Sequence, residues 1–368
     1  MPIIEFDGIH KRYGRTVVLD DLSARMDDAA FNVVLGPPAS GKSVLLRLLT
    51  GLEAPDAGRI TIDGQPMDGV APGDRNVGYV PQSFALYPHY SVLDNITYPL
   101  RLAGTTRRAA AEAAERIAAM LRIDGLLGKM PDQLSGGEKQ RVAIARGIVK
   151  DTDLYVLDDP LTGLDFKLRE QLFDDLREMR RTLGATFVYT TSEPLESLVL
   201  ADTIHILHGG RIAESGAVGE VYRSPRHLRS IEGLGFPASS VLDGTIGSAA
   251  GRPMVRTELF TVPVASIERD RPAGDGTAVR VAIRPEHLHF ERPAGDAVCA
   301  IPAEIVLAED LGGELVIHLA ARGIPLTTVV RHDRELQLDE GAVELFVRHQ
   351  DVVVFDADSL EAVARGGA

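Results

Sequence analysis

Residues 31–43 read FNVVLGPPASGKS and define the fold class more firmly than any other part of the chain. The first five residues form a buried-strand pattern, which ends at Gly36. Residues 36–43 fit the pattern G-x-x-x-x-G-K-[ST], and an apolar helical run follows over residues 44–52. A strand that enters a helix through such a glycine-rich loop is the context in which this pattern binds phosphate groups. The sequence therefore predicts a phosphate-binding loop at the end of a strand.

The loop is expected to hold the phosphates of a nucleotide mainly through its backbone. Its N–H groups, helped by the start of the following helix, would point at the β-phosphate. The Lys42 ammonium would neutralise the β- and γ-phosphate oxygens, and the Ser43 hydroxyl would bind Mg²⁺. The alternative, a glycine-rich turn with an incidental lysine, is disfavoured by the strand–loop–helix context. The residues predicted to bind the nucleotide are Gly36, Pro37, Pro38, Ala39, Ser40, Gly41, Lys42 and Ser43.

A second motif supplies the carboxylate that a magnesium–nucleotide site needs. Residues 154–158 (LYVLD) form another apolar strand pattern, which ends in Asp158 and is followed by Asp159. A carboxylate at the end of a neighbouring strand holds the magnesium ion beside such loops. The alternative is a pair of solvated aspartates at a strand end. In a chain with a phosphate-binding loop, Asp158 is the predicted metal carboxylate.

Strand-like and helical segments alternate up to Ser224. Phe31–Leu35, residues 154–157 and residues 186–190 show continuous rather than alternating hydrophobicity, which is typical of a sheet covered on both faces. Apolar residues recur at helical spacing between Thr105 and Ile123. We therefore predict an α/β domain over residues 1–236.

The pattern changes after Ser224. Prolines and glycines mark a linker that ends near Pro237. Short strand-like runs separated by turns follow, and helical runs are nearly absent. This pattern predicts a small all-β domain over residues 237–368, built as a partly closed barrel. The strand-like runs span residues 279–283, 301–307, 315–319, 345–347 and 352–355.

Composition limits the classes of protein to which the chain can belong. Its 368 residues suggest about two domains. Acidic residues outnumber basic residues 53 to 39, and the formal charge of −14 argues against a protein that coats nucleic acid. Cys299 is the single cysteine, which excludes an intrachain disulfide. No apolar stretch approaches the roughly 20 residues of a membrane-spanning helix, so we expect a soluble or peripheral protein of the cytoplasm.

Residues 134–141 (LSGGEKQR) lie between the strand motifs, and with them the chain resembles the ATP-binding subunits of ABC transporters. Residues 79–93 (YVPQSFALYPHYSVL) are similar to the family's Q-loop, with Gln82 as its glutamine. Residues 160–165 (PLTGLD) are similar to the D-loop. Tyr13 lies where the family stacks an aromatic ring on adenine. The order and spacing of these motifs make the resemblance specific.

The resemblance implies a P-loop ABC nucleotide-binding domain with a mixed sheet and a helical subdomain over about residues 83–134. It also implies ATP and Mg²⁺ as cofactors, with Gln82 as a further metal ligand. In this family two domains hold two ATP molecules head to tail, each on the loop of one chain and capped by the signature segment of the other. Glycine lets the capping backbone approach a phosphate closely. The capping residues would be Ser135, Gly136, Gly137 and Glu138, the last in place of the usual glutamine.

The second domain narrows the type of transporter. Residues 283–288 (IRPEHL) resemble a segment of the OB-like, TOBE-type regulatory domain of maltose-type importers. The resemblance implies import of a carbohydrate or polyol. His287 and His289 would lie on one face of a strand, but no third ligand is apparent. Surface or core histidines are therefore favoured over a metal pair.

Two departures from the family pattern belong to the machinery of ATP hydrolysis. Asp159 stands where the family has the glutamate that polarises the attacking water, and one methylene less draws the carboxylate back by roughly 1.5 Å. Ser192 stands where the family has a histidine that contacts the γ-phosphate, and serine is shorter and uncharged. A milder departure is Pro38-Ala39, in which Pro38 lacks an N–H group. Asp159, Gln82 and Ser192 are therefore the predicted catalytic positions of a weakened site.

These departures predict an asymmetric pair of ATP-binding subunits. This chain would bind ATP in a slow site, while its signature segment completes a fast site on a second, catalytically complete chain. The alternatives are a slowly hydrolysing homodimer and a regulatory subunit that senses nucleotide. A DNA-repair or translation ATPase is disfavoured by the single ATPase half and the acidic charge.

Further partners follow from the resemblance alone. Permease subunits are expected to contact Ala85, Leu86 and Tyr87, which follow Gln82 in the Q-loop. A periplasmic solute-binding protein would act indirectly, and no nucleic acid is expected as a partner. The chain would then be a peripheral subunit at the cytoplasmic face of the inner membrane.

Overall fold

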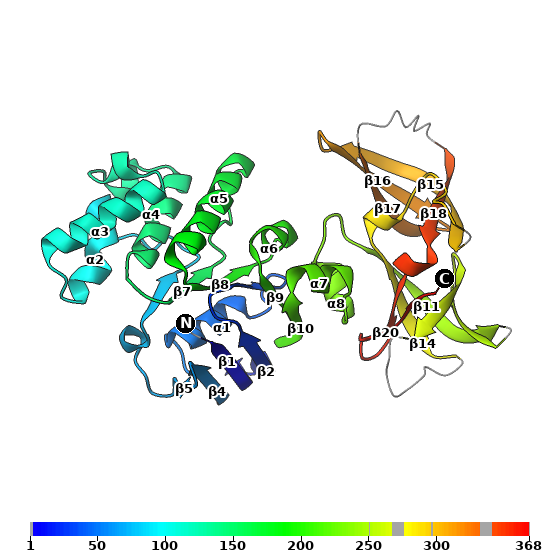
Figure 1. Cartoon of the computed structure of the whole chain (residues 1–368), viewed down its shortest axis with the longest axis horizontal. Coiled ribbons are helices and arrows are strands. Elements are labelled where there is room, and N and C mark those ends of the chain that lie inside the picture. Colours follow the sequence, from blue (N-terminus) through cyan, green and yellow to red (C-terminus); the bar gives the residue numbers. More distant parts are fainter. Residues whose placement is uncertain (1–2, 250, 267–275, 296, 332–340, 368) are drawn as a thin grey trace. The chain divides into compact units, whose positions relative to one another are not determined.

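The structure is a computed structural model that describes the chain except for residues 1–2, 250, 267–275, 296, 332–340 and 368. It divides into two compact units, Met1–Gly219 and Glu220–Ala368, and Figure 1 shows the elements of both. Helix α7 (Val218–Arg223) spans the division, and α8 (Leu228–Gly233) belongs to the second unit. The division falls before Phe236, the expected end of the first domain.

The first unit is built on a six-stranded sheet with the strand order β10-β9-β3-β8-β7-β6. Five of the strands are parallel, and β10 is antiparallel to β9. Every residue of β3, β7 and β8 is buried, which confirms the predicted α/β class and all three predicted strands. Because the strands are parallel, the carboxyl ends of β3, β7 and β8 meet at one edge of the sheet. The bounds are β3 Phe31–Leu35, β6 Val77–Val80, β7 Leu154–Asp158, β8 Thr186–Thr191, β9 Thr203–His208 and β10 Arg211–Ala217.

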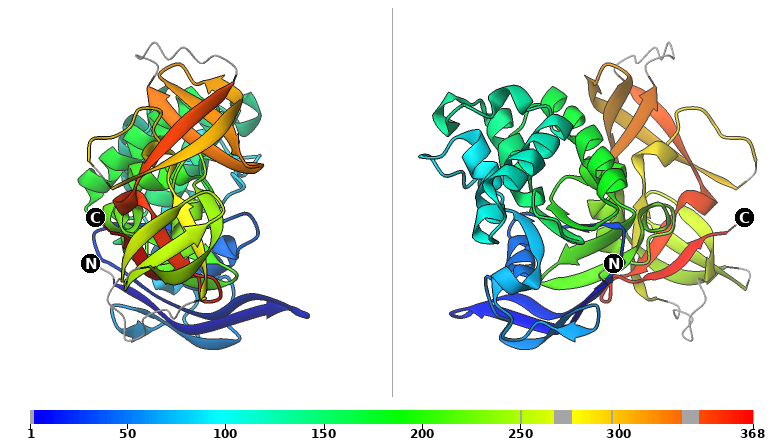
Figure 2. Two further views of the ribbon diagram at one scale, coloured as in Figure 1. Left: turned by 90° about the vertical axis from the view of Figure 1, so that its right-hand side faces the viewer. Right: turned by 60° about the vertical axis from the view of Figure 1, so that its left-hand side comes forward.

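The two faces of this sheet are covered differently (Figures 1 and 2). On one face, Val34, Val156 and Val188 pack with helix α1 and with an antiparallel sheet of order β2-β1-β4-β5. The sequence patterns did not predict this second sheet. Its long pair β1–β2 carries several register shifts that interrupt the alternation of buried and exposed residues. The bounds are α1 Lys42–Thr50, β1 Ile4–Tyr13, β2 Thr16–Met26, β4 Ala57–Ile62 and β5 Gln65–Pro66.

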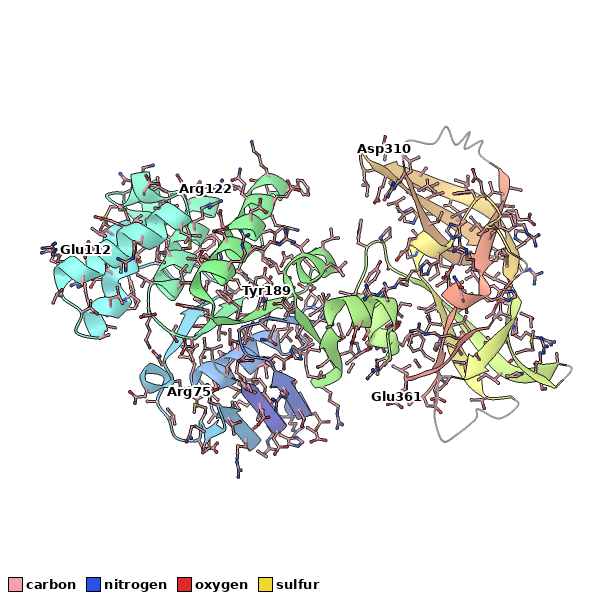
Figure 3. All side chains as sticks on the ribbon, viewed as in Figure 1. Arg75, Glu112, Arg122, Tyr189, Asp310 and Glu361 are labelled. Carbon is pink, nitrogen blue, oxygen red and sulfur yellow. The ribbon has the colours of Figure 1, made fainter. Side chains whose placement is uncertain are left out.

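Helices cover the opposite face of the six-stranded sheet, where Phe31 and Tyr189 pack into their shared core (Figure 3). A buried ion pair between Arg141 and Asp175 joins α4 to α5, and Arg141 also donates to the Leu121 carbonyl at 2.8 Å. Among the described helices, none is long and apolar enough to cross a membrane. The bounds are α2 Val92–Leu102, α3 Arg107–Met120, α4 Gly136–Ile148, α5 Phe166–Leu183 and α6 Pro194–Leu200, with short 3-10 turns at Pro72–Arg75, Asp124–Leu126 and Pro131–Gln133.

The second unit contains a six-stranded barrel and a four-stranded antiparallel sheet with a shared hydrophobic core. The barrel is closed, because β14 pairs with both β11 and β19, whereas the sequence predicted a partly closed one. Each predicted strand-like run lies in or overlaps a strand. The barrel strands are β11 Ser240–Ala249, β12 Arg252–Thr257, β13 Thr261–Ser266, β20 Ala362–Gly366, β19 Val353–Asp356 and β14 Ala278–Ile283. The sheet strands are β17 Ile324–Arg331, β16 Glu314–Ala321, β15 Val298–Asp310 and β18 Ala342–Arg348, with 3-10 turns at Pro285–His287 and His349–Asp351.

Candidate active site

The phosphate-binding loop connects β3 to α1, and its glycines meet specific steric demands. A Cβ atom on Gly36 would lie 2.5 Å from the Leu207 carbonyl oxygen, so no side chain fits there. Gly41 has φ 107°, a conformation that L residues rarely adopt. Helix α1 begins at Lys42, two residues earlier than the sequence pattern indicated. The amino end of α1 therefore starts inside the loop, where it can bind an anion.

Lys42 is positioned inside the loop by the loop itself. Its ammonium donates to the carbonyl oxygens of Gly36 at 2.8 Å and Pro37 at 3.0 Å. Burial lowers the pKa of Lys42, while the nearby carboxylates of Asp159 and Asp158 act in the opposite direction. The side chain therefore brings one positive charge to the place where the β- and γ-phosphates are expected.

Three oxygen-bearing side chains, from β7, β8 and α1, converge at the strand ends. The Asp158 carboxylate accepts hydrogen bonds from Ser43 Oγ at 3.0 Å and from Thr190 Oγ1 at 2.9 Å. Asp158 is 4% exposed, so its charge depends on these partners. A carboxylate and a hydroxyl are hard oxygen ligands of the kind that Mg²⁺ prefers. The geometry therefore fits the predicted roles of Ser43 and Asp158.

Asp159 occupies a strained position directly after this cluster. Its φ of 46° is left-handed, a region that aspartate tolerates better than most side chains. Its backbone N–H donates to Thr190 Oγ1 at 3.1 Å, and its Oδ2 accepts from Gln82 Nε2 at 3.4 Å. Its buried Oδ1 has no hydrogen-bond partner among the described residues. One carboxylate oxygen is thus left for a further donor.

Ser192 follows β8, whose end is fixed by a buried carboxyl group. Glu196 accepts hydrogen bonds from Tyr189 Oη at 2.7 Å and Thr191 Oγ1 at 2.6 Å, and burial raises its pKa. Thr191 Oγ1 also accepts from the Glu193 N–H at 3.0 Å. Ser192 lies between these anchored neighbours, so the position of its backbone is fixed from both sides.

A pocket of about 480 Å³ brings most of the predicted residues together. The sequence offered a signal for two of the lining residues that were not predicted. Thr162 belongs to the PLTGLD segment, and Glu193 adjoins Ser192. Val18 and Val44 carry no such signal. The described lining residues are Val18, Pro38, Ala39, Ser40, Gly41, Lys42, Ser43, Val44, Gln82, Asp158, Asp159, Thr162, Ser192 and Glu193.

Tyr13 is not among the described residues that line this pocket. Its hydroxyl is hydrogen-bonded to Glu53, which also accepts from Arg47 Nε at 2.6 Å. The Lys11 ammonium lies 5.5 Å from the centre of the Tyr13 ring. The ring is 43% exposed, and its stacking on adenine stays a prediction.

The signature segment begins α4 and is likewise absent from the described lining of the pocket. Ser135 Oγ accepts from the Glu138 N–H at 3.3 Å, and Glu138 Oε2 accepts from the Ser135 N–H at 2.7 Å. This capping box explains why an acidic residue fits at 138. A Cβ on Gly137 would lie 2.7 Å from Leu168 Cδ1, whereas one on Gly136 would meet nothing within 4 Å. Packing within this chain thus accounts for the lack of a side chain at residue 137, but it does not account for the lack of one at residue 136.

Comparison with known proteins identifies the family. The model described as ABC transporter matches residues 19–162, and the TOBE domain model matches residues 281–355. The maltose/maltodextrin import ATP-binding protein MalK of Yersinia pestis bv. Antiqua (strain Antiqua) is 35% identical over 347 residues, which cover 93% of this chain and 92% of that protein. This chain belongs to the ABC transporter family.

Other members of the ABC transporter family are similarly close to the chain. The sn-glycerol-3-phosphate import ATP-binding protein UgpC of Jannaschia sp. (strain CCS1) is 35% identical over 340 residues, 92% of this chain and 93% of that protein. A dimeric ATP-binding cassette solved with ADP and Pi bound shares its fold with part of this chain, with a TM-score of 0.54 and 24% identity. That likeness covers 58% of this chain and 98% of the cassette. ATP hydrolysis coupled to transport is the activity of this family.

Among the described residues, no group of three or more histidine, cysteine, aspartate or glutamate side chains could hold a metal ion. His287 ends the 3-10 turn Pro285–His287, so the two histidines do not share a face of one strand as the sequence predicted. The absence of such a group does not bear on Mg²⁺, because a magnesium site needs few protein ligands when phosphates supply the others.

Ala39 is the loop residue whose backbone departs most from its ordinary preference, with φ 62°. We expect Ala39→Gly to raise the free energy of unfolding by about 0.5–1 kcal/mol. Relief of left-handed strain contributes about 1–2 kcal/mol, and the greater freedom of glycine in the unfolded chain removes about 0.5–1 kcal/mol. Urea denaturation measures the change. Ala71→Gly is the matched control, because Ala71 has φ −64° and should only be destabilised; equal destabilisation of both variants would contradict the strain.

Proposed function

We propose that this chain is the ATP-binding subunit of an importer for a carbohydrate or polyol, and that it pairs with a second, catalytically complete ATP-binding chain. The observation that carries the proposal is the composition of one pocket. Lys42, Ser43 and Asp158 supply the groups needed to bind MgATP, whereas Asp159 and Ser192 stand at the two positions of the hydrolysis machinery. The groups that bind MgATP are therefore complete, whereas the two side chains that would act in its cleavage are shorter than those usual in the family.

The shortened groups limit the rate at which this site cleaves ATP. A general base contributes about 10²–10⁴-fold when its carboxylate reaches the attacking water. Asp159 places its carboxylate one methylene short, and its Oδ2 is also held towards Gln82. Ser192 can donate a hydrogen bond but carries no charge. ATP and Mg²⁺ are thus held in a slow site, with Ser43 and Asp158 as metal ligands and Gln82 as a further one.

The signature segment of this chain would serve the other subunit. Ser135 is an intact helix cap, and the space around Gly136 leaves its backbone accessible to an incoming phosphate. The γ-phosphate of ATP on the partner chain would be bound there, at the positive end of α4. A partner with glutamate and histidine at the two changed positions would then possess a fast site.

The permease is proposed to contact the loop that contains Ala85 and Tyr87. Arg146 braces this loop by donating to the carbonyl oxygens of Ala85 at 2.5 Å and Phe84 at 2.9 Å. Tyr87 is 40% exposed, and its ring lies tilted against that of Tyr98 at a centroid separation of 4.8 Å. A braced loop with an exposed aromatic ring suits the transmission of motion to a membrane subunit. The chain would act at the cytoplasmic face of the inner membrane, and a periplasmic solute-binding protein would deliver the solute.

Affinity purification of the complex from membranes tests the proposal. We expect permease subunits, a solute-binding protein and a second ATP-binding chain with the complete pair of catalytic residues. A complex with two copies of this chain and no other ATPase would favour the slow homodimer. Recovery without any permease would favour a nucleotide-sensing regulator and overturn the proposal.

A further inference from the structure

The second unit contains a pocket of about 270 Å³ that the ATP site does not use. Among the described lining residues, arginine side chains dominate the charge: Arg223, Arg284 and Arg365 line the pocket, against the one carboxylate of Asp351. Ile231 and Val353 add a small apolar wall. In a chain whose formal charge is −14, three guanidinium groups around one small pocket are an unusual concentration of positive charge.

Arg284 forms a rigid part of this pocket. It is 4% exposed and donates to the carbonyl oxygens of Leu234 at 2.6 Å and Tyr222 at 2.8 Å. Its guanidinium lies 3.8 Å from the centre of the Tyr222 ring. The neighbouring Glu286 carboxylate accepts from Tyr222 Oη at 2.6 Å. The hydrogen bonds of Arg284 thus go to carbonyl groups, while the Glu286 carboxylate offsets part of its positive charge.

The other two guanidinium groups are partly or fully accessible to solvent. Within the described parts of the chain, no carboxylate forms an ion pair with Arg223 or Arg365. Arg223 is exposed and Arg365 half-buried, so both can adjust to a ligand at little cost. The planar guanidinium matches phosphate oxygens in paired hydrogen bonds, which makes arginine well suited to such groups.

We propose that this pocket binds a small phosphorylated sugar or polyol. The phosphate is bound between Arg223 and Arg365 in the field of Arg284, Asp351 accepts a hydrogen bond from a ligand hydroxyl, and Ile231 and Val353 contact the carbon skeleton. The pocket is too small for a nucleic acid or a protein segment of any length, and a pocket of this size suits a compact metabolite. The proposal is independent of the proposed function, because it involves no residue of the ATP site.

Isothermal titration of the full-length chain with a hexose 6-phosphate, with inorganic phosphate and with the unphosphorylated hexose tests the site. The titrations use the Lys42→Ala background, so that the phosphate-binding loop does not contribute. We expect the hexose 6-phosphate to bind more tightly than inorganic phosphate, and the free hexose not to bind. Arg223→Gln combined with Arg365→Gln should weaken binding by about 100-fold, roughly tenfold for each charge-assisted hydrogen bond that the substitutions remove. Arg280→Gln, on barrel strand β14 and paired with Asp243, should change the affinity less than about twofold.

A second variant keeps the test decisive if the double variant folds poorly. Asp351→Asn should weaken the binding of the hexose 6-phosphate, because its sugar hydroxyl loses a charged acceptor. The binding of inorganic phosphate should stay unchanged or become tighter, because inorganic phosphate has no sugar hydroxyl and a nearby negative charge is removed. Equal affinity of the Arg223/Arg365 double variant and the parent chain, or the absence of binding at millimolar ligand, would overturn the proposal. ATP hydrolysis by the chain with wild-type Lys42 is measured separately, so failure of this site and failure of the proposed function remain distinguishable.

Discussion

Lys42→Ala is expected to lower the affinity of the chain for MgATP by at least about 100-fold. The ammonium is 8% exposed and is held by the Gly36 and Pro37 carbonyl groups, so it lies where phosphate oxygens bind. Each hydrogen bond from a charged donor contributes about 1.5–3 kcal/mol, and the removal of one or two such bonds costs ~3 kcal/mol or more. Equilibrium binding of a fluorescent ATP analogue measures the effect.

Lys150→Ala is the control for the lysine substitution, because Lys150 lies outside the described lining of the ATP pocket. The affinity of the Lys150→Ala variant for MgATP should match that of the unaltered chain. In cells, Lys42→Ala should abolish solute uptake if the chain drives transport. Unaltered nucleotide affinity would show that the loop does not bind phosphates, and intact uptake with altered regulation would identify a sensor instead.

Asp159→Glu combined with Ser192→His is expected to raise the turnover of ATP in this chain's own site by about 100-fold. The longer carboxylate reaches the attacking water, and the imidazole contacts the γ-phosphate. Correct placement of a general base contributes about 10²–10⁴-fold. The left-handed backbone at residue 159 opposes this gain, because a glutamate in that conformation costs about 1–2 kcal/mol relative to its usual conformation. Phosphate release at saturating ATP measures the turnover.

Two controls define the meaning of that result. Asp151→Glu lengthens an exposed aspartate outside the pocket and should leave turnover unchanged. Asp159→Asn should remove the residual activity, because the amide cannot accept the proton. A double variant no faster than the unaltered chain would show that residues 159 and 192 do not limit hydrolysis.

The strands of the parallel sheet that were predicted from the sequence share one property, a continuous run of apolar residues. Phe31–Leu35, with its continuous apolar pattern, is a fully buried strand of the parallel sheet. The antiparallel sheet of the first unit was missed, since bulges in β1 and β2 break the alternation that identifies half-buried strands. Closure of the barrel could not be predicted either, because it depends on the pairing of β13 with β20 and of β14 with β19, which are far apart in the sequence.

The site was predictable where chemistry depends on short motifs. The contact of Ser43 with Asp158 joins two motifs separated by more than a hundred residues, and only their shared position at strand ends indicated it. The role of Thr190 as a donor to Asp158 had no signal beyond its position in a strand. The left-handed backbones of Ala39 and Asp159 were also beyond prediction, because alanine rarely adopts this conformation and aspartate, which adopts it more often, does so at a minority of its positions.

A single-turnover experiment on the purified complex tests the asymmetric pair most directly. The complex is loaded with radiolabelled ATP at two molecules per pair of ATP-binding chains, and phosphate formation is followed by rapid quenching. An asymmetric pair gives two phases of equal amplitude, a fast one from ATP bound to the partner chain and a slow one from ATP bound beside Lys42 and Asp159 of this chain. A single phase in which both ATP molecules are cleaved at the same rate would contradict it.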